Sequence, residues 1–124
     1  MAQLFICLGS IFAGLSVMAG AFGAHALKTQ ISPSALEIFK TGAQYQMYHA
    51  LALLFVGLRI NQTETSQLVV KVAGWAWIAG ILIFSGSLYA LSLTGIKWLG
   101  AITPLGGVAF ILGWGCLAFA ATKL

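Results

Sequence analysis

Nine side chains capable of chemistry stand within or beside the long apolar runs of this sequence. They are two histidines, three tyrosines, two glutamines and two serines: His25, Gln44, Tyr45, Gln46, Tyr48, His49, Ser85, Ser87 and Tyr89. Polar and ionisable groups are costly inside a membrane segment, so each of them indicates a functional or structural requirement. Tyr45 and His49 are four residues apart, which places them on one face of a helix.

Two histidines invite haem or metal ligation, but no nearby carboxylate or thiolate completes a conventional set of ligands. The only acids, Glu37 and Glu64, fall in connecting segments, and Cys7 and Cys116 stand alone inside apolar runs. This distribution also offers no Ser/His/acid arrangement for nucleophilic catalysis. We therefore expect no enzyme activity, no cofactor and no metal, and a haem- or quinone-linked redox role stays open as an alternative.

The elements that position these side chains must be membrane helices, because the chain is too apolar for a soluble domain. Of its 124 residues, 60% are hydrophobic and 6% are charged, whereas about a quarter are charged in an ordinary domain. The formal net charge is +4, yet the six cations stand singly at the edges of apolar runs. Nucleic-acid binding needs clustered cations, so we expect the lipid bilayer, and no nucleic acid, as a partner.

Four apolar segments approach or exceed the roughly 20 residues that a helix needs to cross the hydrocarbon core. They run from about 4 to 27, 41 to 60, 68 to 93 and 103 to 121. The predicted fold is an all-α membrane protein, a four-transmembrane-helix bundle that forms a single domain over residues 1–124. The cations divide three to three between the two sides, so the positive-inside rule leaves the orientation open.

The connection between the first two spans has a structural signal of its own. Ser32 and Pro33 have the pattern of an N-cap followed by proline in the first helical turn, and Leu36 and Phe39 give the stretch an apolar side. We expect a short interfacial amphipathic helix here, leading into the second span. The connection at 61–67 has the composition of a polar loop. The last span is expected to begin at a cap and first turn formed by Thr103-Pro104.

Antiparallel connectivity places the polar residues in one leaflet, because they fall at the end of the first span, the start of the second and the end of the third. The opposite half of the bundle is almost free of them. We predict that six of them border one polar vestibule open to a single side of the membrane: His25, Tyr45, His49, Ser85, Ser87 and Tyr89. A dry hydrogen-bond network between helices is the alternative arrangement of the same residues.

Small residues recur at steps of three and four in the first and last spans. Such stripes let membrane helices approach closely. The predicted helix-packing residues are Gly9, Ala13, Ser16 and Gly20 in the first span and Gly106, Ala109 and Gly113 in the last. They serve either packing within one chain or self-association, and the pattern leaves both open.

Four motifs stand in order along the chain: Gly20–Leu27, Tyr45–Ala52, Phe84–Tyr89, and Pro104–Gly107 followed by Gly113-Trp114. This set resembles the domain-of-unknown-function 423 family, the YgdD-like inner-membrane proteins with eukaryotic relatives. The resemblance covers nearly the whole chain. It implies a multi-pass bundle of four spans in the bacterial plasma membrane, and it implies no particular activity.

Two functional hypotheses follow from these residues. In the first, a small membrane protein binds or passes a solute through the polar half of the bundle, as a homo-oligomer. In the second, a non-catalytic accessory or structural subunit packs against a larger membrane complex. Neither the polar residues nor the small-residue stripes name a substrate.

Overall fold

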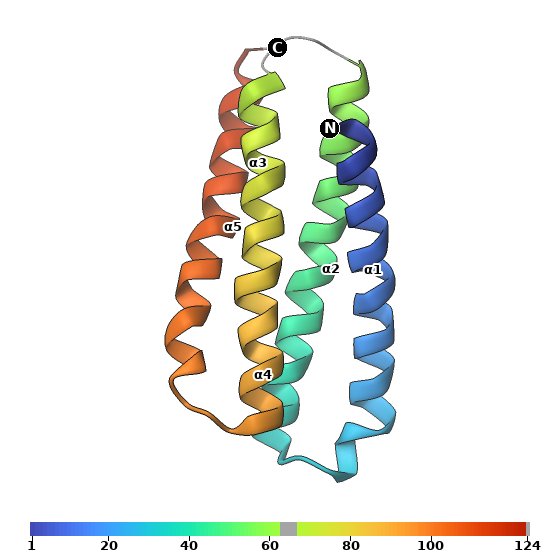
Figure 1. Cartoon of the computed structure of the whole chain (residues 1–124), viewed down its shortest axis with the longest axis vertical. Helices are drawn as coiled ribbons and strands as arrows, with labels where there is room; N and C mark the ends of the chain where they lie inside the picture. The colour runs from blue at the N-terminus through green and yellow to red at the C-terminus, as the bar shows by residue number, and fades with distance from the viewer. Residues whose placement is uncertain (63–66, 124) are drawn as a thin grey trace.

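The computed structural model describes residues 1–62 and 67–123, which form long helical rods packed side by side (Figure 1). In chain order the elements are α1 (Ala2–His25), the 3-10 turn η1 (Leu27–Thr29), α2 (Pro33–Gln62), α3 (Gln67–Gly80), the π-helix η2 (Ile81–Ser85), α4 (Gly86–Thr94) and α5 (Leu99–Ala121). The segments α3, η2 and α4 follow one another without a break and form a single rod, which we call the third rod. Both termini lie at the same end of the molecule (Figure 1).

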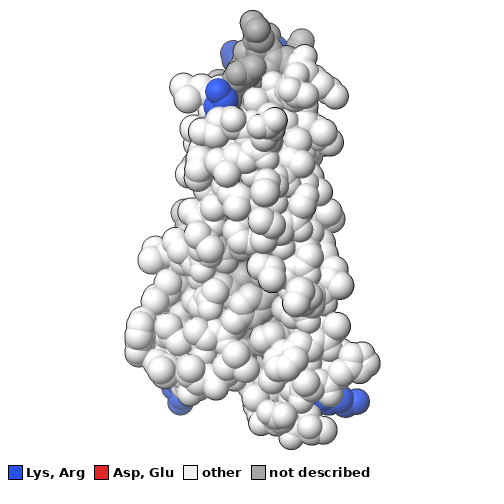
Figure 2. Space-filling view, turned by 45° about the vertical axis from the view of Figure 1, so that its right-hand side comes forward, with Lys and Arg blue, Asp and Glu red and all other residues white. Residues whose placement is uncertain are grey.

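Three of the helices are long and apolar enough to cross a membrane: Ala2–His25, Leu68–Thr94 and Leu99–Ala121. At 1.5 Å per residue each of them is about 35 Å or longer, which exceeds the hydrocarbon thickness of about 30 Å. The distribution of charged residues is also the one expected of membrane-spanning helices. On the face shown in Figure 2, lysine and arginine gather at the two ends, and the long middle carries none.

The short interfacial helix predicted between the first two spans is not a separate element. Pro33 to Gln62 is one continuous helix, capped by Ser32, whose Oγ accepts the N–H of Ala35 at 3.1 Å. Leu36 and Phe39 are buried against Leu27 instead of resting on the membrane surface. The predicted cap is therefore correct, but the apolar side it begins faces the bundle, so nothing separates this stretch from the rest of α2.

The predicted start of the last span is wrong by about one turn. α5 begins at Leu99, and Pro104 lies inside it, where it cannot donate to the carbonyl of Gly100. The connection before it is short because Gly95 ends α4 in the left-handed conformation, with φ 72° and its N–H donating to Leu91 O at 2.8 Å. Glycine has no Cβ and adopts this conformation without steric cost, which makes it the usual residue after a helix end. The predicted loop at 61–67 lies mostly outside the described residues.

The rods pack most extensively as two pairs, α1 with α2 and α3 with α5, and α2 also packs against the third rod. The centre of the core holds fully buried Phe5, Leu53, Val56 and Trp77. Phe5 packs so closely on Gly74 that a Cβ there would lie 2.6 Å from its ring. α2 packs against α1, α3, η2 and α4, so it has neighbours on most sides, and many of its residues are buried.

Some of the predicted small residues lie at close contacts between helices of this chain, and others have open space beside them. A Cβ on Gly9 would lie 2.9 Å from the Ala50 carbonyl, one on Gly106 would strike the Phe84 backbone, and one on Gly113 would strike the Trp77 indole. Gly20 has open space beside it. The remaining members are buried Ser16 and half-buried Ala13 and Ala109.

Candidate functional site

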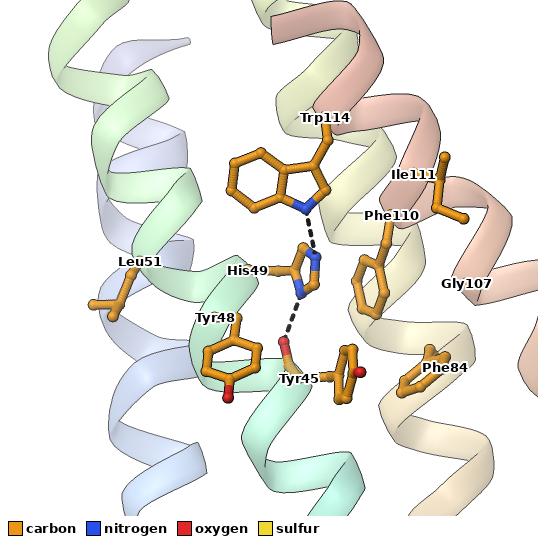
Figure 3. Close-up of a pocket in the computed structure, with 9 residues that line it drawn as sticks. All are labelled: Tyr45, Tyr48, His49, Leu51, Phe84, Gly107, Phe110, Ile111 and Trp114. Carbon is orange, nitrogen blue, oxygen red and sulfur yellow. Dashed lines mark hydrogen bonds between the residues drawn. The ribbon is translucent and has the colours of Figure 1, made fainter. Parts of the chain in front are cut away.

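A pocket of about 670 Å³ lies between α2 and α5, with part of its wall supplied by the third rod (Figure 3). Most of its lining is apolar or aromatic, and no lining residue carries a formal charge. The lining residues are Tyr45, Tyr48, His49 and Leu51 from α2, Phe84 from η2, and Gly107, Phe110, Ile111 and Trp114 from α5.

Glycines at two helix crossings place the two phenylalanines of this pocket. The Phe110 ring lies directly over Gly80, where any Cβ would collide with it, and the backbone of Phe84 lies against Gly106. Phe84 itself belongs to the π-helical turn, a local widening of the helix that often occurs at functional sites. These close approaches bring α5 onto the third rod, and the space between α5 and α2 remains as the pocket.

His49 is the buried polar residue of the pocket, with 4% of its surface exposed. Its Nε2 accepts the indole N–H of Trp114 at 3.0 Å, so its Nδ1 carries the proton and donates to the Tyr45 carbonyl at 2.7 Å (Figure 3). An Nε2 that accepts a hydrogen bond belongs to a neutral imidazole. This bond links α2 to α5 between residues 65 positions apart.

Both ring nitrogens of His49 are therefore engaged, and a haem or metal would have to displace Trp114 to reach Nε2. Among residues 1–62 and 67–123, no group of three or more His, Cys, Asp or Glu side chains is placed to hold a metal ion. His25 cannot supply a second axial ligand, because it is exposed at the end of α1 and does not line the pocket. The two histidines are therefore not arranged to ligate a haem or a metal ion.

Aromatic rings give the pocket its shape. The His49 and Phe110 rings are stacked with centroids 3.6 Å apart and planes 7° from parallel. The Tyr45 ring is nearly parallel to both, at 14° to His49 and 18° to Phe110. Phe84 closes one side, with its centroid 5.0 Å from that of Tyr45 and 5.2 Å from that of Phe110. Three rings from two helices thus share nearly one orientation.

Of the six residues predicted to border one vestibule, the structure brings only Tyr45 and His49 into this pocket. Ser85 and Ser87 are buried and hydrogen-bonded elsewhere, Ser85 to the Gly42 carbonyl at 2.7 Å and Ser87 to Thr103 Oγ1 at 2.6 Å. Tyr89 donates to Gln46 Oε1 at 2.7 Å, and His25 is exposed. The six residues do not form one polar cavity, because the helices turn them toward different neighbours.

A second polar group, which we call the polar seam, joins α1, α2 and the third rod. Ser16 donates to the Ala43 carbonyl, and Gln46 donates to the Phe12 carbonyl at 2.8 Å while accepting from Tyr89. Ser85 adds its bond to Gly42. In the described part of the chain no buried side-chain nitrogen or oxygen lacks a partner. The polar seam has the form of a satisfied network that holds helices together.

Sequence reasoning missed the aromatic members of the pocket, Phe84, Phe110 and Trp114. One signal was present: Phe110 and Trp114 are four residues apart, the same spacing as Tyr45 and His49, so each pair occupies one helical face. Nothing in the spacing indicates that these two faces meet, since that depends on how α5 packs against the third rod.

The apolar helices and the distribution of charge define a multi-pass plasma-membrane protein, and comparison with known sequences agrees. The family described as "Protein of unknown function (DUF423)" matches residues 19–107, and the chain belongs to this family.

Named bacterial membrane proteins are similar to the chain over nearly its whole length. The chain is 51% identical over 121 residues to the UPF0382 membrane protein YwdK of Bacillus subtilis (strain 168), covering 98% of both chains. It is 50% identical to the UPF0382 membrane protein SAB0533 of Staphylococcus aureus (strain bovine RF122 / ET3-1), covering 98% of this chain and 97% of the relative. No solved structure matches the chain.

Proposed function

We propose that this protein crosses the membrane four times and binds a small uncharged molecule, taken from the bilayer, in the pocket between α2 and α5. The pocket itself carries the proposal. Its volume of about 670 Å³ lies in the usual range for small-molecule sites, which are concave, mostly apolar and supplied with a few placed polar groups. We propose binding rather than catalysis, because the pocket holds no nucleophile paired with a free base.

The fourth span in this proposal is α2. Its 30 residues extend about 45 Å, longer than the hydrocarbon core is thick. Polar residues lower its hydropathy, but Gln46 and His49 are buried and bonded to neighbouring helices. A helix flanked on several sides needs less apolar surface of its own than a helix that faces lipid.

The topology can be tested with a membrane-impermeant thiol reagent on single cysteines at Lys28 and Asn61, which respectively precede α2 and stand at its end, after replacement of Cys7 and Cys116. If α2 crosses the membrane, Lys28 and Asn61 lie on opposite sides. Finding Lys28 and Asn61 on the same side would remove the fourth span.

Access to the pocket is proposed from the lipid phase. Leu51 and Ile111 line the pocket and are also exposed at the molecular surface, by 52% and 72%. They lie well inside helices whose charged residues are confined to the ends. An opening at this depth faces hydrocarbon, so a molecule dissolved in the bilayer can enter it without crossing an aqueous phase.

Filling the pocket tests the proposal. Gly107 lines it, and a Cβ there has only ordinary contacts with Phe84 at 3.9 Å, so Gly107→Leu places a side chain in the cavity at low steric cost. Gly115→Leu is the matched control, because Gly115 lies on the same helix with nothing within 4 Å. Small molecules extracted from protein purified out of native membranes are compared by mass spectrometry.

We expect an uncharged compound that co-purifies with the wild-type chain and with Gly115→Leu but is lost from Gly107→Leu. A compound retained equally by all three proteins would place binding outside the pocket. A wild-type protein that carries nothing beyond bulk lipid, and takes up no added apolar compound, would overturn the proposal.

A second candidate is a non-catalytic role in a homo-oligomer or a larger membrane complex, and the outer face of α1 favours it. Gly14 and Gly20 have open space beside them, and the neighbouring Val17 and Met18 are exposed by 61% and 66%. Exposed small residues let another helix approach closely. Purification in mild detergent distinguishes the outcomes: a stoichiometric partner or a stable homo-oligomer supports this role, and a monomer contradicts it.

A further inference from the structure

We infer that the pocket between α2 and α5 selects a neutral molecule with a flat conjugated ring that bears a carbonyl-type hydrogen-bond acceptor, as in a quinone-type ring. This inference rests on the proposed function and names the chemical class of its ligand. Three features of the lining residues carry it: the charge, the orientation of the aromatic rings and the hydroxyl groups that remain available.

The charge of the pocket favours a neutral ligand. None of the nine lining residues is Lys, Arg, Asp or Glu. His49 is about 24 Å along α2 from Pro33 at 1.5 Å per residue, close to the middle of the rod. An aromatic lining can attract a cation through the faces of its rings. At this depth, however, an ion without a counter-charge is costly, and no lining residue supplies one.

The orientation of the rings favours a flat ligand. The ring planes of His49, Phe110 and Tyr45 are parallel to one another within 18°, although the residues come from two different helices. A planar ring that adopts this direction can lie in offset stacking contact with its neighbours, which adds to the free energy of burying its area. A puckered saturated ring of the same volume touches each aromatic face with fewer atoms and loses part of the dispersion attraction.

The hydroxyl groups favour an acceptor on the ligand. The Tyr48 oxygen accepts from Gln44 Nε2 at 2.5 Å, which leaves the Tyr48 proton to donate. The Tyr45 hydroxyl makes no hydrogen bond within the described part of the chain, and both tyrosines line the pocket. Lipid tails offer no acceptor, so an unpaired O–H at this depth lacks the bond that water would supply. A ligand carbonyl supplies it, whereas the N–H groups of His49 and Trp114 are already used.

The two tyrosines are neighbours in the wall of the pocket. They are three residues apart on α2, and their ring centroids are 5.6 Å apart. Their hydroxyls point in different directions (Figure 3), so one ligand carbonyl meets one of them, while the apolar tail of the ligand leaves the pocket past Leu51 and Ile111. The ring and its acceptor are thus held on the α2 side, and the tail remains in the bilayer.

Three neutral probes of similar size test the inference with the full chain in lipid nanodiscs: 2-methyl-1,4-naphthoquinone, 2-methylnaphthalene and decahydronaphthalene. They are flat with acceptors, flat without acceptors, and saturated. Binding is the uptake above that of empty nanodiscs, measured by equilibrium dialysis, and Gly107→Leu provides the filled-pocket control. We expect the quinone to bind more tightly than methylnaphthalene by about tenfold, and the saturated probe to bind least.

The double variant Tyr45→Phe/Tyr48→Phe keeps both rings and removes both hydroxyls. It should weaken the quinone about tenfold and leave methylnaphthalene unchanged, a difference that partial unfolding would not produce. If no probe binds above the empty nanodisc, the proposed function fails. If the saturated probe binds as well as the flat ones, or benzyltrimethylammonium binds more tightly than all three, the pocket stands as a binding site and the ligand class inferred here is overturned.

Discussion

The polar seam and the aromatic pocket lie side by side along α2 and use similar residue types for opposite purposes. In the polar seam, Ser16, Gln46 and Tyr89 bond to one another or to backbone carbonyls across three rods. In the pocket, only His49 is bonded across helices, and the rest of the wall is apolar or aromatic with open volume beside it. In lipid, a cluster of polar groups that satisfies itself holds helices together, so the place open to a ligand is the less polar of the two regions.

The largest effect is expected for Gly113→Leu, which disturbs the core shared by both regions. Any Cβ at this position strikes the fully buried Trp77 indole, which also donates to the Phe110 carbonyl at 3.2 Å. Overpacking of this kind costs about 1–3 kcal/mol, or prevents folding. Thermal melting in detergent should show a large fall relative to Gly115→Leu. An unchanged melting temperature would mean that α5 does not pack on the third rod in this way.

Gln46→Leu should destabilise the polar seam and leave the pocket intact. It removes the bond to the Phe12 carbonyl and leaves the half-buried Tyr89 hydroxyl without its acceptor. The loss of these two bonds should cost about 1–3 kcal/mol. Thermal melting reports the loss, and probe uptake at a temperature where the variant is folded should equal that of the wild type. Reduced uptake with full stability would mean that Gln46 belongs to the binding site.

The hydrogen bond between His49 and Trp114 links α2 to α5. Its contribution to the free energy of unfolding should be smaller than the two effects above, about 0.5–1.5 kcal/mol. A double-mutant cycle with His49→Phe, Trp114→Phe and the pair measures this coupling free energy without counting the lost stacking twice. A coupling free energy of zero would show that the two side chains act independently. Tyr89→Phe combined with Trp114→Phe, taken from the two different regions, provides the additive control.

His25→Ala should have the smallest effect. His25 is exposed at the end of α1 and belongs to neither region, although its residue type made it a candidate for the polar site. Exposed substitutions away from caps and bonded networks usually change stability by less than about 0.5 kcal/mol. Both melting temperature and probe uptake should match the wild type. A loss of uptake with stability unchanged would return His25 to the site.

The amino-acid sequence was sufficient for the properties that depend on local pattern or bulk composition. The apolar runs predict membrane helices because a helix satisfies its backbone N–H and C=O groups by internal hydrogen bonds. The ordered motifs indicate the family. Ser32 and Pro33 correctly marked the start of α2 because capping is decided within one turn. The spacing of Tyr45 and His49 correctly placed them on one face.

Local pattern was insufficient where two helix faces had to meet. Nothing near Trp114 in the sequence indicates that its indole reaches His49, 65 positions away, or that Tyr89 turns to Gln46 and not to the pocket. Those partners follow from the rotation of each rod about its axis, which is set by close contacts such as Gly80 beneath Phe110 and Gly106 against Phe84. Helical periodicity says which residues share a face, but only the packing of all the rods together decides which face lies opposite.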